Sequence, residues 1–180
     1  MSPEKNKYGE LIFNDFPDFK PNKTPKEMFL DGIMEGGYFR PIYSSVTKTN
    51  LSLENKKYKF LKKIPDNKIT NENGNKKNNK YNVSVGSSLE FWESKSWIIK
   101  SHPYGWIHWY CDFYSGIRGD DDERQIKRWM GVTGKNGRFK KNLIRQVKEA
   151  KTSFDDYTIS PKIRQTLLHW SYELTENDVK

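Results

Sequence analysis

Apolar positions in the second half of the chain recur with the spacing of amphipathic helices. The run WIHWYCDF at residues 106–113 places aromatic side chains at i, i+3, i+4 and i+7, on one face of a helix. An N-cap followed by proline at Ser160-Pro161 marks another helix start. We therefore expect further helices at residues 120–130, 139–151 and 160–170.

The first hundred residues carry shorter and less regular patterns. One helix is predicted to end near Gly32, with Thr24 as its N-cap, Pro25 in its first turn and Glu27 completing a capping box. Short strands are expected at residues 42–46, 81–85 and 89–100, and a turn at Gly86 would join the last two. The pattern predicts an α+β fold in which an irregular N-terminal half with short strands packs on a mainly helical C-terminal half.

Composition indicates one folded core with polar additions. Hydrophobic residues make up only 34% of the 180 residues, yet aromatics reach 14%, whereas disordered chains are poor in aromatics. This length suits a single domain, 1–180. No apolar run can span a membrane, no signal sequence opens the chain, and one cysteine cannot form an internal disulfide. We expect an intracellular protein, cytoplasmic or nuclear, with no membrane partner.

The formal net charge of +9 is concentrated in one segment. Residues 48–80 hold ten lysines and three acidic residues, so this segment carries +7 and the remainder only +2. Its run NKITNENGNKKNNKYN offers little apolar surface to offset the entropy of ordering. We expect a solvated, low-complexity Asn/Lys insertion at about 48–80. A basic arm that holds phosphate is the alternative.

A second basic group lies between residues 118 and 148, across two predicted helices and the glycine-rich run GVTGKNG. Such a connection can direct backbone N–H groups at a phosphate, and its surroundings resemble a helix-turn-helix segment. The first hypothesis is a non-enzymatic module that binds DNA or RNA. The expected contacts are Arg118, Arg124, Arg128, Lys135, Arg138, Lys141 and Arg145. A solvated face with partly neutralised charges is the alternative.

Two other functions stay open. Tyr38, Phe39 and Arg40, together with exposed tryptophans, would suit the anchors of a protein partner, because Trp, Tyr and Arg dominate interface hot spots. An enzyme of unassigned reaction would instead need a pocket. The residues selected for that pocket are Gly36, Gly37, Arg40, Tyr104 and His169.

The sequence predicts no catalytic residue, metal site or cofactor. His108 and Cys111 lie three residues apart, but no second pair of ligands completes a zinc site. The aromatic neighbours of Cys111 favour packing over a nucleophilic role. Consecutive acids at 120–123 diverge by about 100° per residue on a helix, so capping explains them better than metal binding.

Five long motifs stand out: FPDFKPNKTPKEMF, GGYFRPI, YGWIHWYCDFYSGIR, DDERQIKRW and SPKIRQTLLHWSYEL. In these motifs the chain resembles a family without an assigned activity from eukaryotic microbes, fungi and algae, with large DNA viruses as a further candidate source. The similarity covers most of the chain except residues 48–80. Ile107, His108 and Asp112 stand where the family motif YGWFQWYCRFY has Phe, Gln and Arg. The resemblance implies no activity, and it speaks against a special catalytic role for His108.

Overall fold

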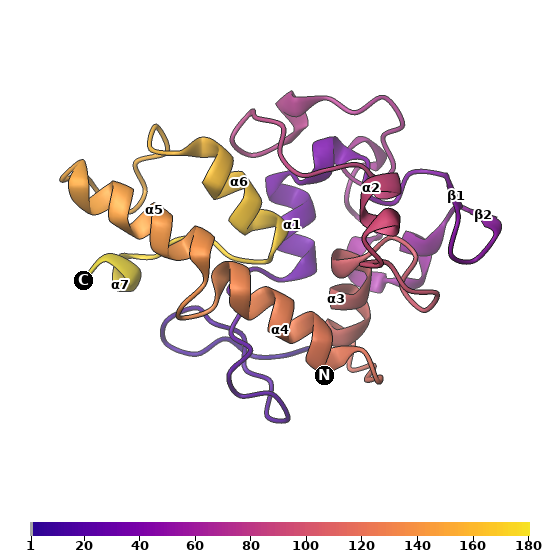
Figure 1. Cartoon of the computed structure of the whole chain (residues 1–180), viewed down its shortest axis with the longest axis horizontal. Helices are drawn as coiled ribbons and strands as arrows, with labels where there is room; N and C mark the ends of the chain where they lie inside the picture. Colours follow the sequence, from indigo (N-terminus) through magenta and orange to yellow (C-terminus); the bar gives the residue numbers. More distant parts are fainter. Residues whose placement is uncertain (1) are drawn as a thin grey trace.

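The computed structural model describes residues 2–180 and confirms the expected α+β fold (Figure 1). Its α-helices are α1 Pro25–Asp31, α2 Leu89–Ser94, α3 Trp106–Tyr114, α4 Asp122–Thr133, α5 Arg138–Glu149, α6 Pro161–His169 and α7 Glu176–Val179. Strand β1, Ile42–Ser44, pairs antiparallel with β2, Thr49–Leu51. Short 3-10 helices lie at Met34–Gly36 (η1), Glu54–Lys57 (η2), Lys59–Leu61 (η3), Asp66–Lys68 (η4) and Lys76–Asn78 (η5).

Helix α1 begins with the predicted capping box. The Thr24 hydroxyl accepts the backbone N–H of Glu27 at 3.1 Å, and the Glu27 carboxylate accepts the Thr24 N–H at 2.7 Å. Pro25 occupies the first turn, and Gly32 ends the helix with φ 106°. A cap of this kind stabilises a helix by about 1 kcal/mol.

Helix α3 lies at the centre of the core. Residues 106–113 are all buried, which confirms the aromatic stripe. Its N-cap is Gly105, which has no side chain to accept a helical N–H. The hydroxyl of Tyr38 takes that place, because it accepts the His108 N–H at 2.9 Å and donates to the Tyr104 carbonyl at 2.6 Å. A residue 70 positions away in the sequence therefore caps the central helix.

Phe19 joins the irregular N-terminal loop to the helical half. Its ring lies 5.0–6.0 Å from the rings of four aromatic residues on α3 and α4: Trp109, Tyr110, Phe113 and Trp129. Burying a phenylalanine contributes about 1.5–3 kcal/mol. The loop before α1 is thus part of the core.

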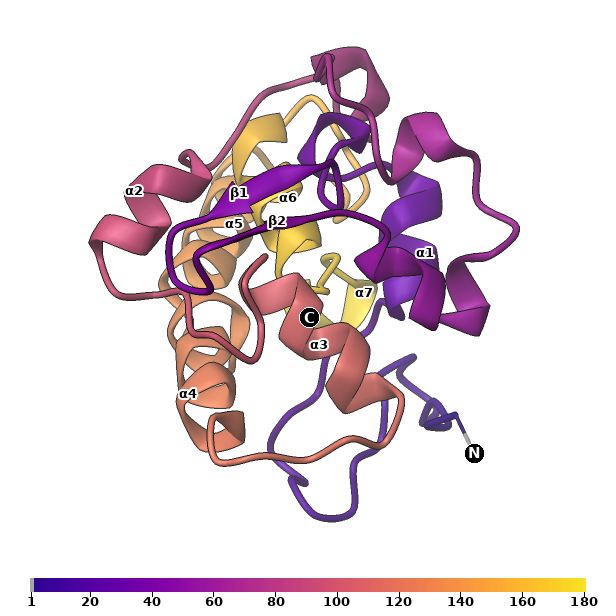
Figure 2. The ribbon, with the colours of Figure 1, turned by 90° about the vertical axis from the view of Figure 1, so that its right-hand side faces the viewer.

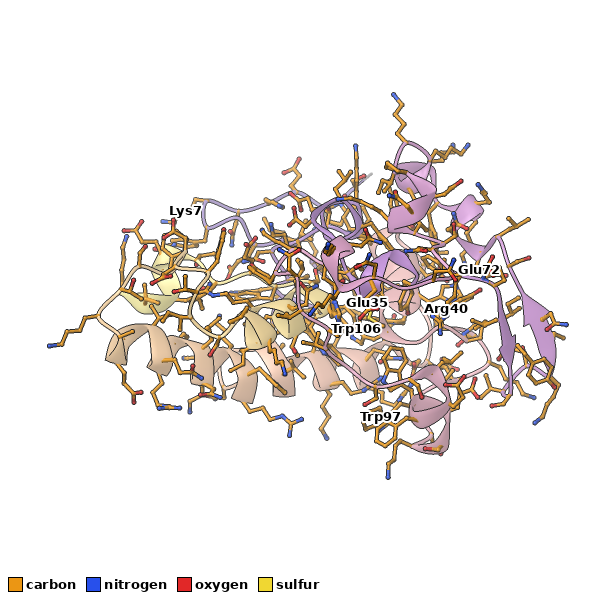
Figure 3. The ribbon with its side chains drawn as sticks, turned by 90° about the horizontal axis from the view of Figure 1, so that it is seen from above. Lys7, Glu35, Arg40, Glu72, Trp97 and Trp106 are labelled. Carbon is orange, nitrogen blue, oxygen red and sulfur yellow. The ribbon has the colours of Figure 1, made fainter. Side chains whose placement is uncertain are left out.

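Helices α4, α5 and α6 build one side of the molecule. Figures 1 and 3 show α4 and α5 following one another end to end, with α6 beside them in Figure 1. Leu143 and Val147 of α5 are buried, and the Trp129 indole N–H donates to the Trp170 carbonyl at 2.8 Å. The two helices of a helix-turn-helix motif cross at about 90–120°. The end-to-end course of α4 and α5 is a different arrangement.

Two strand predictions are wrong. Residues 81–85 are irregular, and residues 89–94 form α2. The Ser88 hydroxyl accepts the Phe91 N–H at 3.2 Å and so caps α2. Leu89 is buried and Trp92 is half-buried three residues later, which is helical spacing and not the alternation of a strand.

The segment 48–80 is not a solvated insertion. Tyr58, Leu61, Ile64 and Ile69 are each at most 5% exposed and belong to the hydrophobic core. The first three lie three residues apart, which is the repeat of a 3-10 helix. Figure 2 shows the magenta segment winding around the outside of α1. Because lysines are so numerous, the average composition of this segment is polar, although it contains a sparse but regularly spaced set of apolar residues.

Asparagines of this segment bind the turn that follows α1. The side-chain oxygen of Asn79 accepts the Glu35 N–H at 2.7 Å, and the Asn78 amide donates to the Glu35 carbonyl at 3.1 Å. A Cβ at Gly36 would overlap the carbonyl oxygen of Asn67. Glycine at 36 therefore allows the segment to approach the turn closely.

Candidate functional site

The first of two adjoining pockets, named here the aromatic pocket, lies between α2, α4, α5 and α6. Its volume is about 640 Å³, within the range of small-molecule sites. Its walls are mainly apolar. Its aromatic walls come from Trp92, Trp97, Trp106, Phe139 and Trp170.

Three cationic side chains line the aromatic pocket. Lys127 and Arg128 come from α4, and Arg138 opens α5. No aspartate or glutamate of the described chain lines it. With these cations and an apolar wall, the pocket favours an anionic ligand with a flat apolar part.

Arg128 is held between two tryptophans. Its guanidinium lies 5.5 Å from the Trp97 ring and 5.4 Å from the Trp170 ring. One Nη donates to the side-chain oxygen of Gln125 at 2.9 Å. Burial, together with the charge of Arg124, lowers the pKa of Arg128 to about 10. The side chain remains cationic at neutral pH, in an orientation fixed before any ligand arrives.

His169 lies on the buried side of the aromatic pocket. Its Nε2 accepts the Met34 N–H at 3.1 Å and lies 3.0 Å from the Gln165 amide nitrogen. Burial lowers the pKa of His169 to about 3. The neutral imidazole acts as a fixed acceptor for the backbone, which is a structural role and not acid–base chemistry.

The second pocket, named here the polar pocket, has a volume of about 350 Å³ and shares six residues with the first: Met34, Tyr38, Val85, Gly86, Ser87 and Trp92. Its remaining walls include Glu35, Gly37, Arg40, Asn71, Glu72, Ser84 and Tyr104. The Tyr104 hydroxyl donates to the Arg40 carbonyl at 2.9 Å, and burial raises the pKa of Tyr104 to about 12.

The structure divides the predicted pocket residues. Gly37, Arg40 and Tyr104 line the polar pocket, whereas His169 lines the aromatic pocket. Gly36 lines neither and receives the backbone of the 48–80 segment.

Three of the predicted basic contacts are neutralised by carboxylates. Arg118 pairs with Asp15 at 2.6 Å and lies over the Phe113 ring at 3.7 Å. Two further pairs join Arg124 to Asp121 and Arg145 to Glu149, both at 2.9 Å. These three arginines therefore fit the alternative to nucleic-acid binding, a solvated face with partly neutralised charges.

The other predicted contacts remain available. Within residues 2–180, no ion pair engages Arg128, Lys135, Arg138 or Lys141. Arg128 and Arg138 line the aromatic pocket. Lys135 is exposed in the connection before α5, and Lys141 is exposed on α5.

The proposed protein-partner anchors do not form a surface. Tyr38 is 3% exposed and Phe39 is fully buried, because both contact His108 of the central helix. Arg40 is half-buried in the polar pocket. Among the tryptophans, Trp97 is exposed at 39%.

The thiol and the histidine of α3 are enclosed. Burial raises the pKa of the Cys111 thiol and lowers the pKa of His108 to about 3. Asp122, from the acidic run, accepts the Trp109 indole N–H at 2.8 Å and the Gly119 N–H at 3.0 Å. Residues 2–180 contain no cluster of three or more His, Cys, Asp or Glu side chains that suits a metal ion. Nor does any helix in this range have the length and apolarity to cross a membrane.

The chain matches no family model, and comparison with curated proteins and with solved structures finds no match. The function is therefore argued from the pockets. The sequence predicts Trp92 and Trp97 in a strand, so it does not predict the aromatic pocket. One feature of the sequence pointed to this pocket: Trp92 and Trp97 lie outside every predicted amphipathic helical stripe. For Glu35, the one sequence signal is its place directly before Gly36 and Gly37, which were selected for a pocket.

Proposed function

We propose that this protein is a non-enzymatic module that binds single-stranded DNA or RNA in the aromatic pocket. The observation that carries the proposal is a pocket lined by four tryptophans and three cations, with no carboxylate from residues 2–180. Proteins hold single strands by stacking bases on aromatic rings while basic groups follow the phosphates. Both features meet in this pocket.

The size and position of the pocket support a single strand. About 640 Å³ takes one or two bases but not a duplex. The α4–α5 course also lacks the crossed helices with which a helix-turn-helix motif enters a major groove. Base contacts are assigned to Trp97 and its neighbours, and phosphate contacts to the cations on the rim.

The charge of the pocket supports a polyanion over a peptide. Lys127 and Arg138 are exposed, and Arg128 is pinned between two rings. Exposed lysines of the 48–80 segment add a long-range attraction to nucleic acid. Affinity is therefore expected to fall steeply as salt rises.

The test is a fluorescence anisotropy titration with labelled twelve-nucleotide DNA and RNA at several salt concentrations. Replacing Trp97 with Ala should weaken binding by about 1–3 kcal/mol, the usual contribution of one stacked base. An Arg128→Gln variant should weaken binding and reduce the slope of log K against log salt by about 0.7, the value for one phosphate of a single strand. Circular dichroism of each variant establishes that it is folded.

The matched control is Arg145→Gln, since Arg145 is exposed on α5 and paired with Glu149. It removes the same charge from the same side of the molecule and should leave affinity nearly unchanged. If Arg145→Gln and Arg128→Gln weaken binding equally, binding depends on the overall charge of the protein and not on the aromatic pocket. If neither DNA nor RNA binds at low salt, the proposal is wrong.

A further inference from the structure

The polar pocket is a separate recognition surface beside the proposed stacking site. It opens next to the aromatic pocket and shares Trp92 and Tyr38 with it. Its own lining contains two carboxylates, Glu35 and Glu72, and a guanidinium, Arg40. A flat ligand stacked near Trp92 would therefore present one edge to both hydrogen-bond acceptors and hydrogen-bond donors.

The turn that carries Glu35 is held in an uncommon conformation. Met34, Glu35 and Gly36 have φ angles of 49°, 56° and 81°, all in the left-handed region. Outside glycine, residues in this region are strained, and strain of this kind concentrates at ligand sites. The backbone of Glu35 forms hydrogen bonds with the side chains of Asn79 and Asn78, and the N–H of Met34 donates to His169.

These hydrogen bonds fix where the Glu35 carboxylate is presented. One of its oxygens accepts the hydroxyl of Ser84. Two carboxylate oxygens have about four acceptor positions, so the group can still accept two further N–H donors. Glu35 forms no ion pair with another residue of the described chain.

Arg40 supplies donors on the same pocket. One Nη donates to the Gly37 carbonyl at 3.1 Å, which ties the side chain back to the turn. A guanidinium has five N–H donors, so most of them stay free for a ligand. Figure 3 shows Glu35, Arg40 and Glu72 gathered in the same part of the molecule as Trp106.

We propose that the polar pocket reads the Watson–Crick edge of a guanine base, with Glu35 accepting N1–H and N2–H and Arg40 donating to O6. This inference rests on the proposed function. Guanine is the base that presents two adjacent donors beside a carbonyl acceptor on this edge. Adenine would point its unprotonated N1 at the carboxylate, and uracil has one donor between two carbonyls. Arginine also donates to guanine O6 when proteins read duplex DNA from the major groove.

The experiment compares labelled octamers of single-stranded RNA: oligo(U), oligo(U) with one central guanosine, and the same strand with inosine or adenosine at that position. We expect the guanosine strand to bind about 10-fold or more tighter than oligo(U) or the adenosine strand. Inosine lacks the N2 amino group and should bind with intermediate affinity. Glu35→Gln should abolish the preference for guanosine, so that the guanosine strand binds no more tightly than oligo(U).

Glu123→Gln is the matched control, because Glu123 is an exposed glutamate on α4 that lines neither pocket. It should keep the guanosine preference. Arg40→Gln provides a second test of the same edge if Glu35→Gln does not fold, and it should also lose the preference. Equal affinity for all four strands overturns the guanine inference and leaves the proposed function standing. Absence of binding to every strand overturns both.

Discussion

The side-chain oxygen of Asn79 accepts the backbone N–H of Glu35 at 2.7 Å and joins two segments 44 residues apart. Asn79 is only 3% exposed, although it belongs to a run of asparagines and lysines. An amide at this position satisfies a backbone donor that the left-handed turn leaves without a helical partner. The polar segment therefore stabilises the turn that lies between the two pockets.

Replacing Asn79 with Ala should lower the free energy of unfolding by about 1–3 kcal/mol, since a buried donor loses its acceptor. Urea denaturation followed by circular dichroism measures the change. Asn73→Ala is the control, because Asn73 is exposed in the same segment. Equal effects of the two substitutions would contradict the role given to Asn79.

Shortening Leu61 tests whether the 48–80 segment belongs to the core. Leu61 is 2% exposed, so Leu61→Ala should cost about 2–5 kcal/mol of stability. Leu53 is 63% exposed in the same segment, and Leu53→Ala should change stability by less than about 0.5 kcal/mol. Thermal and chemical denaturation measure both. A Leu61→Ala protein as stable as the parent would restore the picture of a solvated insertion.

Two buried histidines should make the fold sensitive to acid. Burial lowers the pKa of both His108 and His169 from 6.5 to about 3, so protons bind the unfolded chain first. Their contribution to stability is complete above pH 6.5 and is lost as the pH falls toward 3. Each can add up to about 1.4 kcal/mol per pH unit to the slope.

The measurement is the free energy of unfolding at a series of pH values between 7 and 4. Both ring nitrogens of His108 are buried without a hydrogen-bond partner in the described chain, and its ring packs against Phe39 and Tyr104. His108→Phe should therefore keep the packing and flatten the slope. An unchanged slope in this variant would show that His108 does not contribute to the acid sensitivity.

The Cys111 thiol should report global unfolding. It is fully buried, and burial raises its pKa, so both access and thiolate formation are suppressed. Ellman's reagent should react with the native protein at least about 1000-fold more slowly than with the unfolded chain. Rapid labelling under native conditions, without loss of structure, would mean that α3 opens locally.

Helix starts with side-chain or proline signals were predictable from the sequence. Thr24 and Pro25 mark α1, and Pro161 marks α6, because both signals act within one turn. Helix α2 forms where the aromatic-rich run 89–100 predicts a strand, although Ser88 carries a capping signal. Local chemistry decides such elements, and a short apolar run is ambiguous without it.

The 48–80 segment and the pockets depend on contacts between distant residues. Average composition describes the segment as polar, yet four well-spaced apolar side chains are enough to anchor it in the core. Arg128 was predicted as a basic contact, but its two tryptophan neighbours come from separate elements. No pattern in one sequence could bring these three residues together.

Trp97, Arg128 and Trp170 reach the aromatic pocket from the stretch after α2, from α4 and from the end of α6. A ligand that contacts all three residues links segments of the chain that are otherwise held together only by tertiary packing. Occupancy should consequently appear as a rise in melting temperature that grows with ligand concentration. Proteolytic fragments that carry only the helical half would lack a wall of the pocket and could not retain the ligand.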